Sequence, residues 1–296
     1  MIFDVIITGG SYAGLQAAMT LGRALKHVLV IDSGKPCNRQ TPHSHNFLTR
    51  DGETPGAIAA KAREQTEKYP TVKFLTGKVV NGTKNVDGFT VCTEAGETYT
   101  AKKLLFTTGV YDIMPQIPGF AECWGISVIH CPYCHGYEVH GKQTGIIGNG
   151  DTGYEYARMI SNWTNNLTLF TNGASTFTTE QAEKLASHHI EIVEDLIEEI
   201  EHHQGQIKHL AAGKKYSLDA IYTRPSFRQH CDVPQTIGCR ITDAGYIEVD
   251  EMCQTSIPGI YAAGDCTTPM RSVATAVSGG ALAGVVISKE LINEEF

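Results

Sequence analysis

Cys131 and Cys134 are the residues whose spacing most clearly predicts chemistry in this sequence. They are separated by Pro132 and Tyr133 and are followed by His135. A two-residue spacing lets two thiols close a short disulfide, and a helix N-terminus or a nearby imidazole can lower a thiol pKa until a reactive thiolate forms near neutral pH. The pattern therefore predicts a redox-active dithiol/disulfide pair.

Three other kinds of site contain a similar cysteine motif. With His135 the string matches the c-type haem attachment signature, but haem attachment normally follows export and the N-terminus lacks a basic leader. A zinc site needs a second Cys or His pair at ligand spacing, and the remaining cysteines are single. The tetrapeptide is also the glutaredoxin motif, which in that family lies near the start of a small fold. We therefore favour the redox pair and predict no metal site.

The turn from Gly9 to Gly14 has the spacing of a dinucleotide fingerprint, with Ser11 in place of the middle glycine. Glycines in such a turn let the backbone approach a pyrophosphate, and the helix that follows points its N–H groups at the phosphates. Asp32 stands about 20 residues further on, where a carboxylate binds the adenosine ribose. Gly9, Ser11, Gly14 and Asp32 are therefore candidates for binding FAD.

A second turn matches the glycine pattern completely, with Gly148, Gly150 and Gly153. The strand that follows it ends without a carboxylate for a ribose, and no Arg or Lys lies between Met159 and Glu183 to bind a 2'-phosphate. The sequence therefore predicts a second nucleotide-type fold, but binding of NADPH or NADH there is doubtful.

Both turns lie in the same strand–helix–strand pattern. Apolar run lengths and intervening glycines predict strand 4–8, helix 15–26 and strand 28–32 in the first unit, and strand 144–147, a helix ending near 163 and strand 167–171 in the second. The nucleotide-binding fold is thus duplicated, so the fold class is α/β with two Rossmann-like domains.

The remaining segments predict that the second domain is inserted into the first. Residues 112–119, with two prolines, and 238–245, with two glycines, resemble linkers, and the stretch after the second linker is too short for a third domain. We therefore expect an FAD-binding domain made of residues 1–114 and 243–296. Residues 115–242 form the inserted nicotinamide-type domain that carries the cysteine pair.

Composition narrows the class of partner. The 296 residues carry a net charge of −8 and a pI near 5.8, which argues against nucleic-acid binding. Nine cysteines scattered over the chain and an N-terminus without a leader predict a cytoplasmic protein with mostly free thiols. We expect no segment apolar and long enough to span a membrane.

The order of the glycine turns, the CPYCHG string and the segment 255–265 (TSIPGIYAAGD) resembles the low-molecular-weight thioredoxin reductases, the class II pyridine nucleotide-disulfide oxidoreductases. The resemblance implies that Cys134 faces the flavin, that Cys131 exchanges with the substrate, and that the protein is a homodimer. It also implies further FAD contacts at Asn46, Asp265, Arg271, Ser272 and Val273.

Two departures from that family concern the direction of electron flow. His135 stands where those reductases carry an aspartate as the general acid and base, and an imidazole can do the same work at neutral pH. The family's His-Arg-Arg cluster for NADPH is absent, and CxxC followed by His-Gly-Tyr-Glu resembles the gliotoxin-type dithiol oxidases.

Three hypotheses follow from these departures. The first is an FAD-dependent disulfide oxidoreductase acting on a thioredoxin-like protein or a small-molecule disulfide or dithiol. The second is a dithiol oxidase that passes electrons through FAD to oxygen. The third is a flavin redox sensor without turnover, which the incomplete nicotinamide site would favour.

Overall fold

The computed structural model describes residues 2–296 and divides them into two compact units. Unit 1 contains the chain up to Arg39 together with residues 47–111 and 227–296, and unit 2 contains residues 40–46 and 112–226. The middle of the chain therefore forms its own unit, and the last segment returns to complete the first. The expected α/β fold with two dinucleotide-type domains is confirmed.

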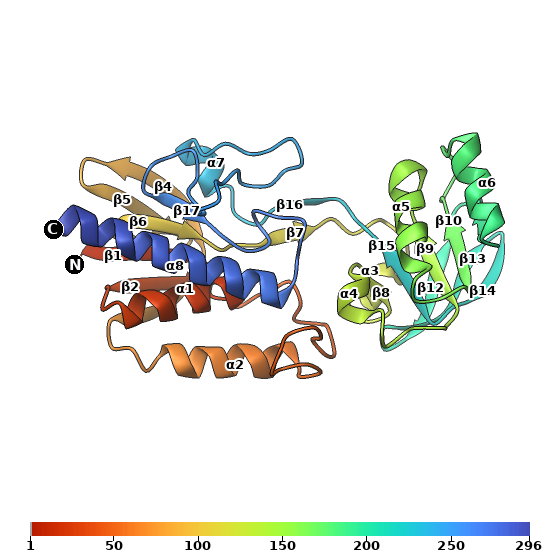
Figure 1. Ribbon diagram of the computed structural model, residues 1–296, viewed down its shortest axis with the longest axis horizontal. Helices are drawn as coiled ribbons and strands as arrows, with labels where there is room; N and C mark the ends of the chain where they lie inside the picture. The colour runs from red at the N-terminus through yellow and green to blue at the C-terminus, as the bar shows by residue number, and fades with distance from the viewer. Residues whose placement is uncertain (1) are drawn as a thin grey trace. The chain divides into compact units, whose positions relative to one another are not determined.

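Unit 1 is built on a seven-stranded sheet with the strand order β3-β2-β1-β6-β5-β4, in which β17 also pairs with β6 (Figure 1). The pairs β1–β2, β1–β6, β2–β3 and β6–β17 are parallel, and β4–β5 and β5–β6 are antiparallel. Its elements are β1 (Ile2–Thr8), α1 (Tyr12–Arg23), β2 (Val28–Asp32), α2 (Pro55–Thr66), β3 (Val72–Thr76), β4 (Val79–Asn85), β5 (Gly88–Thr93), β6 (Thr98–Phe106), β7 (Val110–Asp112), β16 (Phe227–Gln229), α7 (Val233–Ile237), β17 (Ile260–Ala262) and α8 (Val273–Glu295).

Unit 2 contains a five-stranded parallel sheet, β11-β10-β9-β15-β8, and a three-stranded antiparallel sheet, β12-β13-β14. The parallel strands are short apolar runs, as expected for strands covered on both faces. Its elements are α3 (Phe120–Cys123), β8 (Val128–Ile129), α4 (Pro132–His135), β9 (Thr144–Ile147), α5 (Gly150–Ile160), β10 (Leu167–Phe170), α6 (Thr179–Ser187), β11 (Glu191–Val193), β12 (Glu199–His203), β13 (Gln206–Ala212), β14 (Lys214–Ser217) and β15 (Ala220–Thr223).

The two long helices of unit 1 pack against each other at very short range. A Cβ atom added at Gly280 of α8 would lie 2.1 Å from the carbonyl oxygen of Ala13 in α1, so only glycine fits there. Ala17, Ala18 and Leu21 of α1 are fully buried in the same core as Ala283 and Ile287 of α8. Small residues on both helices thus let the C-terminal helix lie directly on the first one.

The second domain boundary differs from the sequence-based one. We expected the inserted domain to end at 242, but the chain rejoins unit 1 at Phe227. The reason is α7, because a Cβ atom at Gly82 of β4 would lie 2.6 Å from Ile237 and 2.8 Å from Val233. These apolar contacts place α7 in the unit 1 core, and no local sequence pattern reports them.

The ends of the predicted helices also differ. Helix α1 begins at Tyr12 instead of 15 and ends at Arg23 instead of 26, because Leu25 adopts a left-handed backbone with φ of 62°. Helix α8 begins at Val273, since Ser272 caps it by accepting a hydrogen bond from the Thr275 N–H at 3.1 Å. Helix α5 ends at Ile160 instead of 163.

By length and composition α8 could cross a bilayer, which makes our expectation that no segment meets this test wrong. It has 23 residues, and most of its length is apolar. However, its Ala276–Gly280–Ala283–Ile287 face is buried in unit 1, and core helices of globular proteins pass the same test. The helix is part of the unit 1 core.

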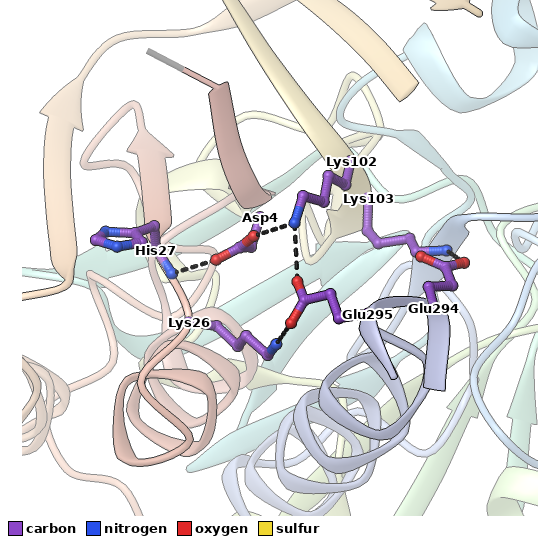
Figure 2. Close-up of polar contacts among 7 residues, drawn as sticks. All are labelled: Asp4, Lys26, His27, Lys102, Lys103, Glu294 and Glu295. Carbon is purple, nitrogen blue, oxygen red and sulfur yellow. Dashed lines mark hydrogen bonds and ion pairs between the residues drawn. The ribbon is translucent and has the colours of Figure 1, made fainter. Parts of the chain in front are cut away.

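An ion-pair network ties the end of α8 to strands β1 and β6 (Figure 2). Lys102 of β6 bonds both Asp4 and Glu295 at 2.9 Å, and Glu295 also accepts a hydrogen bond from Lys26 at 2.8 Å. The two lysines lower the pKa of Glu295 to about 2 through these hydrogen bonds. The last turn of the helix is therefore held by charges on three other segments.

The adjacent Lys103 is buried, with its side chain 7% exposed. Its ammonium group donates to Glu290 and Glu294 at 2.5 Å, and Glu290 also accepts from the Tyr261 hydroxyl. Burial lowers the pKa of Lys103, but the two carboxylates outweigh this effect and leave the pKa raised. The ammonium group is thus held charged inside the unit.

We expect Lys103→Met to lower the free energy of unfolding by about 2–3 kcal/mol, because it leaves Glu290 beside Tyr261 without its cation. Lys102→Met, at the neighbouring and more exposed position, is the matched control and should cost within about 1 kcal/mol. Urea unfolding of both variants measures the difference. Equal losses would show that burial does not decide the strength of these pairs.

Candidate active site

The first glycine turn of unit 1 leaves no room for side chains. Gly9 has φ of 103°, and a Cβ atom at Gly14 would lie 2.0 Å from the Gly9 carbonyl oxygen. The Thr107 hydroxyl donates to that same oxygen at 2.6 Å and fixes the turn to the end of β6. The turn is therefore a backbone cradle at the start of α1, the form that a pyrophosphate fits.

Asp32 lies beside this cradle at the end of β2. One carboxylate oxygen accepts a hydrogen bond from the Gly10 N–H at 2.9 Å, and the other accepts one from the Gly34 N–H at 3.2 Å. The two bonds orient the carboxylate next to the turn, where a ribose diol would be bound. The residues present thus fit the adenosine and pyrophosphate of FAD.

The structure also brings the predicted C-terminal residues to this place. A Cβ atom at Gly264 would lie 3.1 Å from the Cβ of Ala13, so Asp265 follows directly beside the start of α1. The Arg271 guanidinium is 3.7 Å from the Asp265 carboxylate, and Ser272 and Val273 begin α8 next to them. Four of the five further FAD contacts implied by the resemblance therefore gather around one cradle.

Cys37 was not singled out by the sequence and proves to belong to this cluster. Its sulfur is exposed and lies 3.7 Å from the Asp265 carboxylate oxygen. Next to it, the Asn38 amide donates to the Tyr12 hydroxyl at 3.2 Å. The loop after β2 has no motif, and only its position after the Asp32 strand could have signalled a role.

In unit 2, Cys131 and Cys134 form a disulfide across the first turn of α4, with Cα atoms 5.3 Å apart. Cys131 is the N-cap residue, and its carbonyl accepts from the N–H groups of Cys134 and His135 at 3.2 and 3.1 Å. Pro132 fits the first helical position because the missing N–H has no partner to lose there. The sequence Cys-Pro-x-Cys thus makes one helical turn with a sulfur at each end.

The indole ring of Trp163 packs against the disulfide turn of α4. A Cβ atom at Gly136 would lie 2.7 Å from the Trp163 ring nitrogen and 2.4 Å from the Pro132 carbonyl oxygen, so this glycine allows the close approach. Tyr133 packs edge-on against the same ring at 5.3 Å between centroids. Trp163 therefore fixes the position of the disulfide turn.

His135 is half-buried and lies among other titratable groups of unit 2. Its ring meets the ring of His45 edge-on, with centroids 6.2 Å apart. His45 is in turn 3.5 Å from the Glu138 carboxylate. Burial lowers the pKa of His135, His45 lowers it further, and Glu138 opposes the shift. The imidazole next to the disulfide is therefore mostly neutral at pH 7.

Segment 40–46 lies in unit 2, although its neighbours in sequence belong to unit 1. The Gln40 amide donates to the Trp124 carbonyl at 2.8 Å and anchors the segment. Asn46, at its end, has φ of 58° and is exposed. The flavin contact expected for Asn46 stays a prediction. Sequence reasoning included Glu138 only as the last residue of the His-Gly-Tyr-Glu string and gave it no role of its own.

The second glycine turn has the expected tight geometry, since a Cβ atom at Gly153 would lie 2.8 Å from the Gly148 carbonyl oxygen. The side chain of Asn149, however, connects this turn to the loop after β10. It accepts from the Thr176 N–H at 2.8 Å and donates to the Ala174 carbonyl at 2.9 Å. The Thr176 hydroxyl thereby comes within 2.8 Å of a Cβ position at Gly150. The chain's own loop lies over the turn.

The residues at the end of β10 are poorly suited to bind a ribose. The Thr171 hydroxyl donates to the backbone oxygens of Gly173 and Val193, and the Asn172 side-chain oxygen accepts from the Ile197 N–H. Both side chains are engaged inside the unit, and neither is a carboxylate or a cation. The second turn fits a nicotinamide dinucleotide poorly.

The other cysteines lie apart from the disulfide, and Cys266 is fully buried. Its pKa rises to about 12, chiefly through burial, so it stays protonated. Among residues 2–296, no group of three or more His, Cys, Asp or Glu has an arrangement that could hold a metal ion.

Comparison with known proteins covers almost all of the chain. A family model described as pyridine nucleotide-disulphide oxidoreductase matches residues 3–280. Thioredoxin reductase tcpT of Claviceps purpurea is 30% identical, with 99% of this chain and 95% of that protein covered. Thioredoxin reductase sirT of Leptosphaeria maculans is 29% identical, with 99% and 96% covered.

Solved structures give the same result. An oxidoreductase from Agrobacterium tumefaciens is 38% identical with a TM-score of 0.92, and 99% of each chain is covered. A putative thioredoxin reductase from Bacillus anthracis is 29% identical with a TM-score of 0.94, covering 99% of this chain and all of that one. The similarity thus extends over both units.

We expect acid extraction of the purified protein to release FAD and no FMN, because the cradle and Asp32 together fit a dinucleotide. Asp32→Ala should purify with at most about a tenth as much FAD, since about 1–3 kcal/mol of hydrogen bonding is lost. Asp87→Ala, in an exposed turn, is the control. FMN in the parent extract, or full FAD content in Asp32→Ala, would contradict the assignment.

Proposed function

The chain belongs to the pyridine nucleotide-disulphide oxidoreductase family, and from that premise we propose that it exchanges electrons between FAD and a substrate disulfide or dithiol through Cys131 and Cys134. The observation that carries the proposal is the disulfide turn of α4 with a mostly neutral imidazole next to it. A structural disulfide needs no such neighbour. The protein is therefore a thioredoxin-reductase-like enzyme.

The proton and electron count assigns a role to His135. Closing the disulfide between Cys131 and Cys134 from two thiols releases two electrons and two protons. When bound, FAD supplies an acceptor or donor of two electrons and one proton. One proton is left for a side chain, and we assign it to His135, which directly follows Cys134 and can accept it in its neutral form.

The two sulfurs have different roles in this proposal. We assign the attack on the substrate, and the mixed disulfide that it forms, to Cys131, the N-cap residue of α4. Cys134 then resolves that mixed disulfide. The family resemblance supports the same order.

A second function, oxidation of a small dithiol with oxygen as the final acceptor, is favoured by the second glycine turn. Asn149 holds the 174–176 loop over that turn, and Thr171 and Asn172, the two residues directly after β10, carry no charge. Oxygen would take two electrons and two protons and leave as hydrogen peroxide, so no nicotinamide is needed. A third reading, a flavin sensor without turnover, predicts no peroxide at all.

The substrate class, oligomer and compartment are also proposals. A thioredoxin-like protein or a small-molecule disulfide or dithiol is supported by the names of the curated relatives. The seven free cysteines support a reducing compartment such as the cytoplasm. A homodimer is proposed by family resemblance, and light scattering of the FAD-loaded protein would measure it.

The proposed function predicts that excess dithiothreitol bleaches the flavin of the parent under anaerobic conditions. Cys131→Ser and Cys134→Ser should keep FAD but lower the bleaching rate by at least about a hundredfold, because the thiols and the cradle lie in different units. Cys92→Ser, in unit 1, is the matched control. The disulfide reagent dithiobis(nitrobenzoate) should form a stable mixed disulfide with Cys131 of the Cys134→Ser variant, because the resolving thiol is absent. Bleaching at the parent rate in both serine variants would rule out the function.

NADPH and NADH should bleach the flavin slowly, since Thr171 and Asn172 at the end of β10 are uncharged and bonded within the unit, where a 2'-phosphate or ribose would need a charged partner. Dithionite is the control that the flavin can be reduced, and peroxide released in air from dithiothreitol separates oxidase from reductase. Rapid stoichiometric bleaching at micromolar NADPH would show that the second turn opens and binds the nucleotide.

A further inference from the structure

We propose that His45, paired with Glu138, is the proton relay that connects His135 to solvent during thiol–disulfide exchange. The inference rests on the proposed function and adds two residues to it. His135 takes the proton from the thiol, His45 receives it from His135 through one bridging water, and Glu138 stabilises the charge on His45 before solvent removes the proton. No electron moves in these steps, because the two electrons that the thiols release as the disulfide closes pass to the flavin.

The geometry places the three groups next to one another in unit 2. The rings of His45 and His135 lie edge-on, with centroids 6.2 Å apart and planes at 90°, a separation that one bridging water can span. The His45 Nδ1 atom is 3.5 Å from a Glu138 carboxylate oxygen. His45 is brought here by segment 40–46, which departs from its own domain to pack in unit 2.

Exposure is greatest at the end of the path, as a proton leaving the site requires. His135 and His45 are both half-buried, whereas the Glu138 side chain is 38% exposed. A proton that reaches the Glu138 end of the path can therefore pass to water.

Titratable groups surround the path. The His43 ring centroid lies 6.3 Å from that of His45, and burial and Glu138 raise the pKa of Tyr222 of β15 well above its usual range. Tyr222 therefore stays neutral. Of the three groups in the path, Glu138 is the only carboxylate, and it lies next to the His45 imidazole, where it can stabilise a passing proton.

NMR titration of histidine-labelled protein tests the coupling without turnover. Because His45 lowers the pKa of His135 and Glu138 raises it, His45→Gln should move the His135 titration to higher pH and Glu138→Gln should move it to lower pH. His140→Gln is the control, since that exposed ring stacks on Tyr137 in the same loop. Unchanged His135 titration in both variants would overturn the relay.

Kinetics test the direction of proton flow. In anaerobic bleaching by dithiothreitol, His45→Gln should be slowed about tenfold near pH 7, and raising the imidazole buffer concentration should restore its rate but not affect the parent. His135→Ala should lose the rate and also its pH inflection, expected below pH 6.5 because that pKa is lowered. Parent-like rates for His45→Gln at all buffer concentrations would exclude the relay while leaving the function of the cysteines standing.

Discussion

The structure of unit 1 depends on the absence of side chains where α1 meets its neighbours. Gly14 lets the first turn close on the Gly9 carbonyl, and Gly280 lets α8 lie on the Ala13 carbonyl. A methyl group at either place would separate backbones that now touch. Because α8 is held this close, the loop before it delivers Asp265 and Arg271 to the turn that begins the chain. Gly14 and Gly280, which have no Cβ atom, thus allow residues far apart in the sequence to meet at the cradle.

The two glycine turns show how neighbouring side chains decide what a shared backbone can do. Both have the same spacing and both begin a helix after a parallel strand. At the first, Asp32 accepts hydrogen bonds from two backbone N–H groups and presents a fixed carboxylate. At the second, Asn149 bonds to the loop after β10 and draws Thr176 toward Gly150. Asp32 thus presents a carboxylate where a ligand can bind, whereas Asn149 forms hydrogen bonds with a loop of the chain itself.

Sequence patterns predicted the elements whose structure is determined by neighbouring residues in the chain. Strands 28–32 and 144–147 agree with β2 and β9 residue for residue, because a short buried apolar run between glycines has few alternatives. The second domain boundary was wrong because α7 joins unit 1 through contacts with β4. His135 was identified from its position after Cys134, whereas His45 and Glu138 could be assembled with it only in space. The burial that lowers the pKa of His135 likewise depends on packing and leaves no local signal in the sequence.

The ion pairs of Lys102 join Asp4, near the start of the described chain, to Glu295, near its end. On the ribosome these partners emerge at opposite ends of synthesis. All segments of unit 2 are made before residue 227, so that unit can fold while the remainder of unit 1 is still being translated. The sheet around β6 must wait for β17 and α8 to emerge before its core is closed. A nascent chain that has emerged only as far as residue 226 therefore contains all of unit 2 but lacks the β17 and α8 segments of unit 1.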